Sequence, residues 1–286
     1  MEFRQIDIND CCLFNKYAGE TINFENNFAL VYIWNAIFTY EICIYENAIM
    51  ARLNVDGRIV FDPPKTKDKS LDKYIYAAAD YCRKNNIPLV FKILAQDYLN
   101  LRQETKDDFA VEEIRGQWDY IYLAKDLIDF PGRKFQKKRN LLSQFLRNYQ
   151  YDFMDYKKER HFEQILSLQE IWAKSDDSNF ELAPLKRALE NLEALKLSCD
   201  IIEIDGRIAA YSVSNIHNGA GEVLFEKGET RYKGIYAAIA NLTAKKRFSG
   251  IEFVNREEDM DIENLKKSKL SYNPVKQIEK YLLYFK

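Results

Sequence analysis

The chain has 286 residues, 47% hydrophobic and 30% charged, an ordinary balance for a globular protein of one large or two average domains. Its net charge of -2 argues against nucleic-acid binding over the whole surface but leaves a local basic patch open. Five Cys without a Cys-x-x-Cys pair, and only two His, lead us to expect reduced thiols and no metal site. Without a signal-peptide core or a run of about 20 apolar residues, we expect a cytoplasmic protein.

Strand patterns dominate the first half of the chain. Apolar alternation and short turns predict strands at 42–45, 48–53, 59–61, 87–94 and 120–123. Asp56-Gly57 is a typical hairpin turn, and apolar residues at helical spacing predict a helix over 71–82. A further short helix is expected between the last two strands. The aromatic run 28–38 fits either a buried helix or a buried strand.

The second half begins after a joint at 125–133 and alternates helices with strands. Helical periodicity predicts helices within 131–151, at 162–172 and 182–195, from 235 onward, and at 262–269. Strands are predicted at 199–204, 207–216, 223–225, 251–254 and 281–285. Asp205-Gly206 forms the clearest hairpin turn of the chain, between the first two of these strands.

The two halves have a similar order of elements, and both contain an Asp-Gly-Arg-Ile turn, within Val55–Ile59 and Ile204–Ile208. Five residues cannot prove a duplication, but two similar domains in tandem is the favoured interpretation. We therefore predict an α/β (α+β) protein with domains at 1–125 and 126–286.

The segment 131–151 carries an unusual charge pattern, with six cations and no carboxylate. The cations are Arg133, Lys134, Lys137, Lys138, Arg139 and Arg147. Cations at a helix N-terminus oppose the helix dipole, so this start is either a solvated end that tolerates the mismatch or a functional site. In the functional interpretation, Lys137, Lys138, Arg139 and Asn140 bind an anion.

A basic loop between a strand and a helix is the first candidate binding site. Gly234 stands where the helix opens, with Arg231 and Lys233 before it and Lys227 at the end of the strand. Free backbone N–H groups and the positive end of the helix dipole suit a phosphate here. The loop is similar to the coenzyme A pyrophosphate loop of GCN5-related N-acetyltransferases, which implies a coenzyme A thioester as one donor. Tyr236 replaces the small residue of that pattern.

A run of acids after the strand 251–254 is the second candidate. Neighbouring carboxylates raise one another's pKa, so Glu257, Glu258 or Asp259 could serve as a general base. The same run could instead complement the dipole of the helix that follows, as Lys269 could at its other end. Tyr272 is either a general acid or an aromatic residue at a strand edge. His161 and His217 lie in different elements and are interpreted as structural.

Five motifs in a fixed order resemble a family named for the C-terminal domain of phosphatidylglycerol lysyltransferases. They are Phe130-Pro-Gly-Arg-Lys-Phe-Gln-Lys-Lys-Arg-Asn140, Phe225-Glu-Lys227, Gly234-Ile-Tyr236, Asn255-Arg-Glu-Glu-Asp259 and Lys269-Leu-Ser-Tyr-x-Pro274. The resemblance covers nearly the whole chain. Met260-Asp261 replaces an expected Leu-Gly, and Asn264 replaces another expected Gly.

The resemblance implies tandem acetyltransferase-like domains, each a mixed, mostly antiparallel sheet flanked by helices. It also implies kinship with enzymes that transfer an aminoacyl group from charged tRNA to an amine or hydroxyl. Residues of the matched motifs that would line the cleft are Glu226, Asn255, Arg256, Lys269 and Ser271. Two hypotheses follow. The first is an acyl- or aminoacyltransferase, in which the basic residues bind the donor phosphates or the tRNA 3′ end. The second is a non-catalytic module that binds a nucleotide, RNA end or anionic metabolite.

Overall fold

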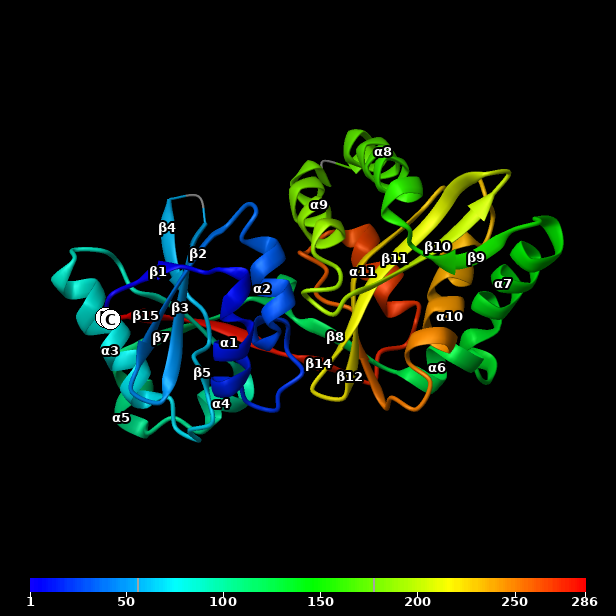
Figure 1. Ribbon diagram of the computed structural model, residues 1–286. Helices are drawn as coiled ribbons and strands as arrows, with labels where there is room; N and C mark the ends of the chain where they lie inside the picture. Colours follow the sequence, from blue (N-terminus) through cyan, green and yellow to red (C-terminus); the bar gives the residue numbers. More distant parts are fainter. Residues whose placement is uncertain (56, 177) are drawn as a thin grey trace. The chain divides into compact units, whose positions relative to one another are not determined.

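The computed structural model (Figure 1) describes residues 1–55, 57–176 and 178–286. Contacts group the chain into two compact units. Unit 1 comprises Met1–Asp119, Glu258–Ile262 and Gln277–Lys286, and unit 2 comprises Tyr120–Glu257 and Glu263–Lys276. Two mixed, mostly antiparallel sheets flanked by helices confirm the predicted fold class. The domain boundary at residues 125 and 126 stays a prediction, because a grouping by contacts does not test which segments fold independently.

Unit 1 contains one sheet with strand order β1-β2-β3-β4-β6-β15-β7, and β5 pairs with β3. Its strands are β1 (Arg4–Gln5), β2 (Thr39–Tyr45), β3 (Ala48–Val55), β4 (Arg58–Phe61), β5 (Lys65–Thr66), β6 (Val90–Leu94), β7 (Phe109–Glu113) and β15 (Lys280–Phe285). Its helices are α1 (Cys11–Tyr17), α2 (Phe28–Trp34), α3 (Asp72–Lys84), α4 (Ala95–Leu99) and α5 (Gln103–Asp108). The C-terminal strand β15 therefore pairs with β6 and β7 of this sheet.

The structure decides the segment that sequence left open and adds strands that sequence missed. The aromatic run folds as α2, whose first turn is capped by the Asn27 side chain accepting from the Ala29 N–H. The strands missed in this sheet are β1 and β5, with two residues each, and β7, which is exposed over most of its length. Short or exposed strands lack the apolar alternation that identifies a strand in a sequence. The predicted turn at Asp56 lies outside the described residues.

The core of unit 1 lies between α3 and one face of its sheet. The helix contributes Tyr74, Ile75 and Ala78, all fully buried, because apolar side chains recur along one side of it. Alternate residues of the strands, such as Phe91 and Ile93, meet this helix. The opposite face of the same strands therefore carries the residues in between.

Unit 2 is built on the second sheet, with strand order β14-β8-β13-β12-β11-β10-β9. The strands of this sheet are β8 (Asp119–Leu123), β9 (Asp152–Asp155), β10 (Ser198–Ile204), β11 (Arg207–His217), β12 (Ala220–Gly228), β13 (Phe253–Asn255) and β14 (Lys276–Ile278). Unit 2 contains all of them except Asp119 of β8 and Gln277 and Ile278 of β14. Its helices are α6 (Ala124–Asp129), α7 (Gln136–Asn148), α8 (Lys158–Asp176), α9 (Leu182–Glu190), α10 (Ile235–Arg247) and α11 (Glu263–Leu270). The helix predicted over 182–195 is shorter, because α9 ends at Glu190.

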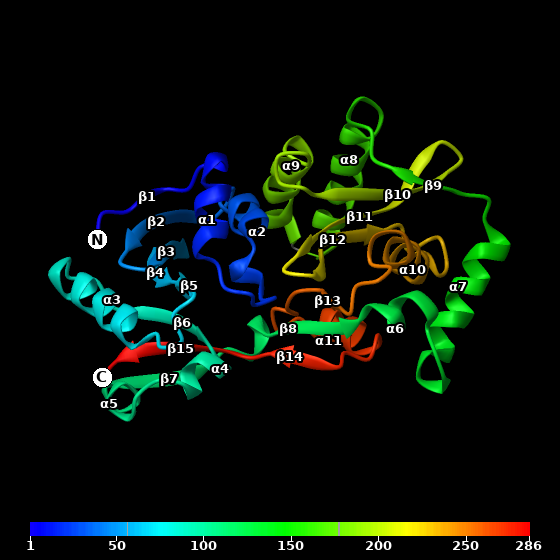
Figure 2. The ribbon, with the colours of Figure 1, turned by 60° about the horizontal axis from the view of Figure 1, so that its bottom comes forward.

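Helices cover both faces of the β11 segment of this sheet. Ala210 belongs to a buried cluster with Ile235 and Ile239 of α10, and α10 also packs against α6 and α7 (Figure 2). The next residue, Tyr211, points the other way and donates its hydroxyl to Gln169 of α8 at 2.6 Å. None of the helices in the described part of the chain combines the length and apolar character needed to cross a bilayer.

The start of α10 fits closely against α7. Gly234 adopts φ of 91°, a left-handed conformation that favours glycine. A Cβ at this position would lie 2.2 Å from the carbonyl oxygen of Leu141 in α7. Gly234 therefore permits the close approach of two helix backbones.

We predict that Gly234→Ala lowers the free energy of unfolding by about 2–4 kcal/mol, combining backbone strain with a steric clash. Gly206→Ala is the matched control, because Gly206 also has positive φ (74°) but nothing lies within 4 Å of its added Cβ. The control should lose only about 1 kcal/mol. Urea denaturation measures both, and equal losses would contradict the close packing.

Candidate active site

Two neighbouring strands of unit 2 bring a cation and a carboxylate together. Strands β12 and β13 are parallel, with Glu222 opposite Asn255, so Glu226 and Arg256 extend beyond this pairing in the same direction. Their side chains form an ion pair with 2.6 Å between Nη2 and Oε1, and only 13% and 8% of the two side chains are exposed. A buried charge pair of this kind is costly to break, because the remaining partner stays desolvated.

Aromatic rings enclose the guanidinium of Arg256. Its central carbon lies 4.6 Å from the ring centroid of Tyr272 and 5.7 Å from that of Tyr122. Tyr272 follows α11, is fully buried and donates its hydroxyl to the carbonyl of Tyr236 at 3.2 Å. The predicted residues Glu226, Arg256 and Tyr272 therefore form one assembly within unit 2.

Lys138, in the first turn of α7, completes this assembly. Its Nζ lies 3.3 Å from the centroid of the Tyr272 ring, a position that suits a cation. Burial of the amine, together with the nearby Arg256 guanidinium, nevertheless lowers the pKa of Lys138 to about 7, and Glu226 opposes this effect. We call Lys138, Glu226, Arg256 and Tyr272 the Lys138 cluster.

The pKa shifts of the other members define their charge at neutral pH. Burial, with a contribution from Glu226, raises the pKa of the Tyr272 phenol, so the phenol stays protonated. Burial opposes the charge of Arg256, but Glu226 and the neighbouring phenols hold its pKa above the usual value. The cluster thus contains a fixed cation, a neutral phenol and an amine divided between its two forms.

Lys269 and Asn255 hold the backbone around Arg256. The Lys269 ammonium donates to the carbonyl of Arg256 and, at 3.3 Å, to that of Glu257. The Asn255 side chain accepts from the Glu257 N–H at 2.8 Å. Ser271 instead donates to the Ser268 carbonyl on the exposed side of α11. Lys269 and Asn255 therefore position the end of β13.

Several groups of the basic loop that are predicted to bind phosphate already have partners within the protein. Lys227 forms an ion pair with Glu181 at 2.7 Å, and exposed Arg231 pairs with Glu229 at 2.5 Å. The Lys233 N–H donates to the Tyr149 hydroxyl at 3.1 Å. With Gly234 close to α7, part of the anion-binding capacity of this loop is already used within unit 2.

Tyr236, which departs from the acetyltransferase pattern, stands at the start of α10. Its ring contacts Trp172 edge-on, with centroids 6.2 Å apart. Burial raises the pKa of its phenol, and a hydrogen bond from the Gly228 backbone partly opposes the rise. The Trp172 indole donates to the Gly228 carbonyl at 3.2 Å. Tyr236 and Trp172 thus pack together beside Gly228, the last residue of β12.

The three predicted acids are not in the Lys138 cluster. Glu257 is the last residue of the unit 2 segment Tyr120–Glu257, whereas Glu258 and Asp259 belong to unit 1. Asp259 is fully buried and lies 3.2 Å from Arg115. Burial raises the pKa of Glu258, and Lys280 opposes the rise. The carboxylate that contacts Arg256 is Glu226, and a base role for the three acids stays a prediction.

The backbone after these acids shows what replaced the expected glycine. Asp261 has φ of 56°, within the left-handed region that glycine favours. Its N–H donates to the Asp259 carboxylate at 2.9 Å. Asp261 therefore keeps a glycine-like backbone conformation, which an aspartate tolerates better than most residues.

The basic start of α7 divides into internal and exposed cations. Arg139 donates to the carbonyls of Phe130 and, at 2.6 Å, of Gly132, and Lys134 pairs with Asp126 at 3.0 Å. The cation Lys137 is exposed, and so is the neutral Asn140.

The two histidines lie apart from the cluster residues in sequence. His161 is fully buried and accepts the Lys157 N–H at 2.9 Å, while burial lowers the pKa of His217 to about 4. In the described part of the chain, no three His, Cys, Asp or Glu side chains gather where a metal ion could be held.

Sequence reasoning missed Tyr122 and Trp172 as neighbours of the predicted site. Tyr122 donates its hydroxyl to the carbonyl of Lys269 at 2.9 Å and contributes its ring to Arg256. Both aromatics follow ordinary strand or helix patterns, which indicate a core and not a site.

We predict that the Lys138 amine loses its proton near pH 7 in the folded chain and near pH 10.4 in the unfolded chain. Between these values the unfolded chain holds the extra proton, so this group makes the free energy of unfolding rise with pH, by about 1 kcal/mol per unit. Lys138→Met should lack this rise, whereas Lys125→Met, at an exposed position, should keep it. Urea denaturation from pH 7 to 9 compares them, and parallel curves for wild type and Lys138→Met would refute the shifted pKa.

Comparisons with known proteins complete the description of the chain. The sequence matches the family described as phosphatidylglycerol lysyltransferase, C-terminal, over residues 19–284. It is 29% identical over 187 residues to an uncharacterized protein of Mycoplasmoides gallisepticum, a match that covers 62% of this chain and 60% of that relative.

Solved structures share the fold. A conserved protein of unknown function from Bacteroides thetaiotaomicron superposes with a TM-score of 0.91 at 25% identity, over 100% of both chains. L-PGS from Bacillus licheniformis gives 0.70 at 15% identity, covering 99% of this chain and 93% of that one. A tandem GNAT protein from the clavulanic acid pathway gives 0.53 at 11% identity, covering 99% and 98%, so the fold is GNAT-like. The family match over nearly the whole chain shows that it belongs to the phosphatidylglycerol lysyltransferase C-terminal family.

Proposed function

We propose that this chain is an aminoacyltransferase that moves an aminoacyl group from a charged tRNA 3′ end to an amine or hydroxyl acceptor at the Lys138 cluster. The observation that carries the proposal is an amine with a pKa of about 7 beside a buried guanidinium–carboxylate pair. Shifted lysines of this kind suit general base catalysis, which needs a group that exchanges protons near the working pH. Membership of a lysyltransferase family supports the reaction class.

The neutral Lys138 amine would take the proton of the attacking amine or hydroxyl. The acceptor atom forms a bond to the ester carbonyl carbon, and the bond from that carbon to the ribose oxygen then breaks. The Lys138 ammonium returns the proton to the leaving ribose oxygen, so no group is consumed. Arg256 stabilises negative charge that develops on the carbonyl oxygen, while Glu226 fixes the orientation of the guanidinium.

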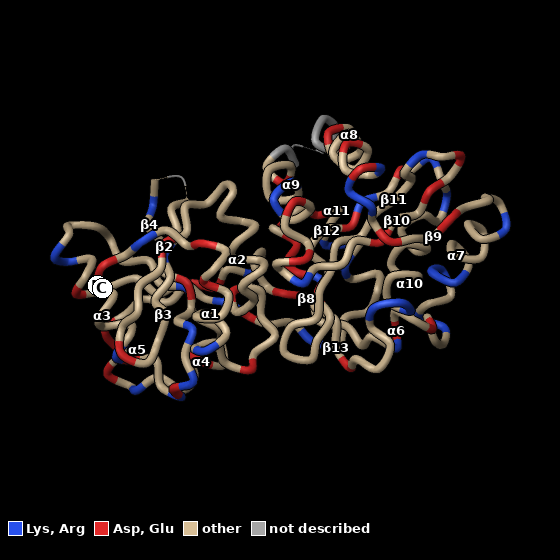
Figure 3. The backbone as a smooth tube through the Cα atoms, in the orientation of Figure 1, with Lys and Arg blue, Asp and Glu red and all other residues tan. Residues whose placement is uncertain are grey.

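The occupied basic loop favours a tRNA donor over a coenzyme A thioester. Coenzyme A would need free N–H groups at the start of α10, but the Lys233 N–H bonds to Tyr149 and Gly234 adjoins the α7 backbone. By contrast, Arg133 and Lys137 of the acid-free segment 131–151 are exposed. Figure 3 marks Lys and Arg positions in blue near the α6 and α7 labels. Phosphate contacts from such side chains supply affinity without reading sequence.

A second candidate function is a non-catalytic binding module. The Arg256–Glu226 pair supports it, because a buried ion pair enclosed by aromatic rings is also a common structural arrangement. In that case charged tRNA or another anionic ligand would bind without transfer of its aminoacyl group.

We predict that the single-turnover rate of aminoacyl transfer rises with pH through an inflection near 7. The rate is measured as loss of labelled amino acid from a mixture of charged tRNAs, with phosphatidylglycerol or small amines as acceptor. Lys138→Met should slow transfer by roughly 10²–10⁴-fold and abolish the inflection, since the base is absent. Lys138→Arg should also fail, because arginine stays protonated.

The exposed Lys125→Met variant is the control and should retain both rate and inflection. If Lys138→Met keeps the wild-type profile, Lys138 is not the base. If charged tRNA binds but no acceptor is labelled by wild type, the binding module is the better description.

We predict that charged tRNA raises the melting temperature of the chain and that acetyl-CoA does not. A ligand at about 100 times its Kd stabilises a fold by roughly 2.7 kcal/mol, which thermal unfolding detects readily. The tRNA effect should fade with salt, and replacing Arg133 and Lys137 by Gln should reduce the salt slope by about one unit per lost phosphate contact. Stabilisation by acetyl-CoA that Arg231→Ala removes would overturn the choice of donor.

A further inference from the structure

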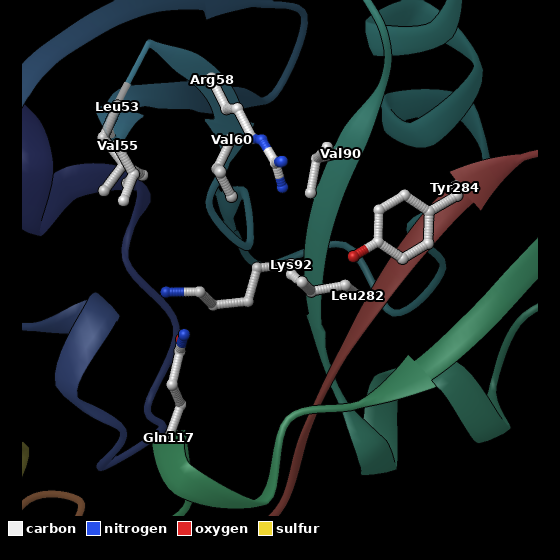
Figure 4. A pocket seen from close by; sticks show the side chains of 9 residues that line it. All are labelled: Leu53, Val55, Arg58, Val60, Val90, Lys92, Gln117, Leu282 and Tyr284. Atoms are coloured by element: carbon white, nitrogen blue, oxygen red, sulfur yellow. The ribbon is translucent and has the colours of Figure 1, made fainter. Parts of the chain in front are cut away.

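The face of the unit 1 sheet that points away from α3 contains a cavity of about 510 Å³. Its lining residues alternate along the strands with residues of the α3 core, as Val90 and Lys92 alternate with Phe91 and Ile93. The lining consists of Leu53, Val55, Arg58, Val60, Val90, Lys92, Gln117, Leu282 and Tyr284 (Figure 4).

Four cross-strand pairs build this cavity. Leu53 lies opposite Val60 and Val55 opposite Arg58 in the β3–β4 hairpin. Lys92 lies opposite Leu282, and Val90 opposite Tyr284, in the β6–β15 ladder. Because the pairs come from four regular strands, the lining is set by the register of the sheet. Gln117, after β7, adds an amide.

Two cations line the cavity, and they differ in their ion pairs. Lys92 lies 3.3 Å from each of two buried carboxylates, Glu25 and Asp62, so its charge is balanced within unit 1. Arg58 forms no ion pair with any carboxylate of the described residues, and Figure 4 shows its side chain directed into the space between the lining residues. The Tyr284 hydroxyl donates to Glu112 at 2.8 Å, so its proton is already used.

We propose that this cavity binds a small aliphatic monocarboxylate. The carboxylate would accept from the Arg58 guanidinium and the Gln117 amide, and the aliphatic chain would contact Val55, Val60 and Val90. Arg58 is the lining cation without an ion pair to a described carboxylate, so the cavity suits a ligand with a single negative charge. A cavity of this volume is of the size that holds small-molecule ligands, roughly 300–1,000 Å³. The proposal does not depend on the transferase activity.

Isothermal titration of the full chain with octanoate, octanol and octylamine tests the proposal. The three probes share an aliphatic chain and differ in head-group charge. Octanoate should bind at least about tenfold more tightly than octanol, because a hydrogen bond to a charged group contributes that factor or more. Octylamine should bind more weakly than octanol, since its ammonium would face Arg58.

Arg58→Gln should weaken octanoate binding by about tenfold and leave octanol binding unchanged. Arg207→Gln is the matched control, because Arg207 is also an exposed first residue of a strand that follows an Asp-Gly pair. This variant should bind octanoate and octanol as the wild type does. Val60→Phe should fill the cavity and weaken both probes. Thermal unfolding verifies that each variant folds. Octanol binding as tight as octanoate, or octanoate binding that survives Arg58→Gln and Val60→Phe, would overturn the proposal.

Discussion

The buried ion pair between Arg256 and Glu226 is the constraint on which the geometry of the Lys138 cluster depends. The two side chains extend from adjacent parallel strands, and neither can lose its partner without leaving a desolvated charge. The rings of Tyr272 and Tyr122 enclose the guanidinium, which excludes water from it. The same guanidinium helps to lower the pKa of Lys138. Burial is the larger cause of that shift, and Glu226 opposes it, so the pair modulates the protonation of the amine that we propose as the base.

Unit 1 depends on a comparable arrangement of buried charges around its last strand. The Lys280 ammonium lies 2.8 Å from Asp119 and 3.0 Å from Glu25, and all three side chains are buried. Because an unpaired ammonium here would be strongly destabilised, these carboxylates fix the place of β15 between β6 and β7. The position of β15 also sets one wall of the cavity lined by Leu282 and Tyr284.

Sequence reasoning identified most members of the candidate site but not their partners. Glu226, Arg256, Tyr272 and Lys138 were all predicted, since they stand in ordered motifs that combine charge with aromatic residues. The acids 257–259 were predicted as the base from their density, their position after a strand and their place in a family motif. In the structure Asp259 is held by Arg115, more than 140 positions away in the chain. Motif spacing carries no information about a contact at that separation.

The sequence by itself determined the fold class, most helices and strands and the hairpin turn at Asp205-Gly206, because periodicity and turn residues act locally. The resemblance of its ordered motifs identified the family. Tertiary structure alone decided that 28–34 is helical, that β15 joins the first sheet, and that Gly234 serves helix packing. It also decided the pKa of Lys138, which depends on burial and on a guanidinium 118 positions away. These properties arise from contacts between distant segments, which no local pattern encodes.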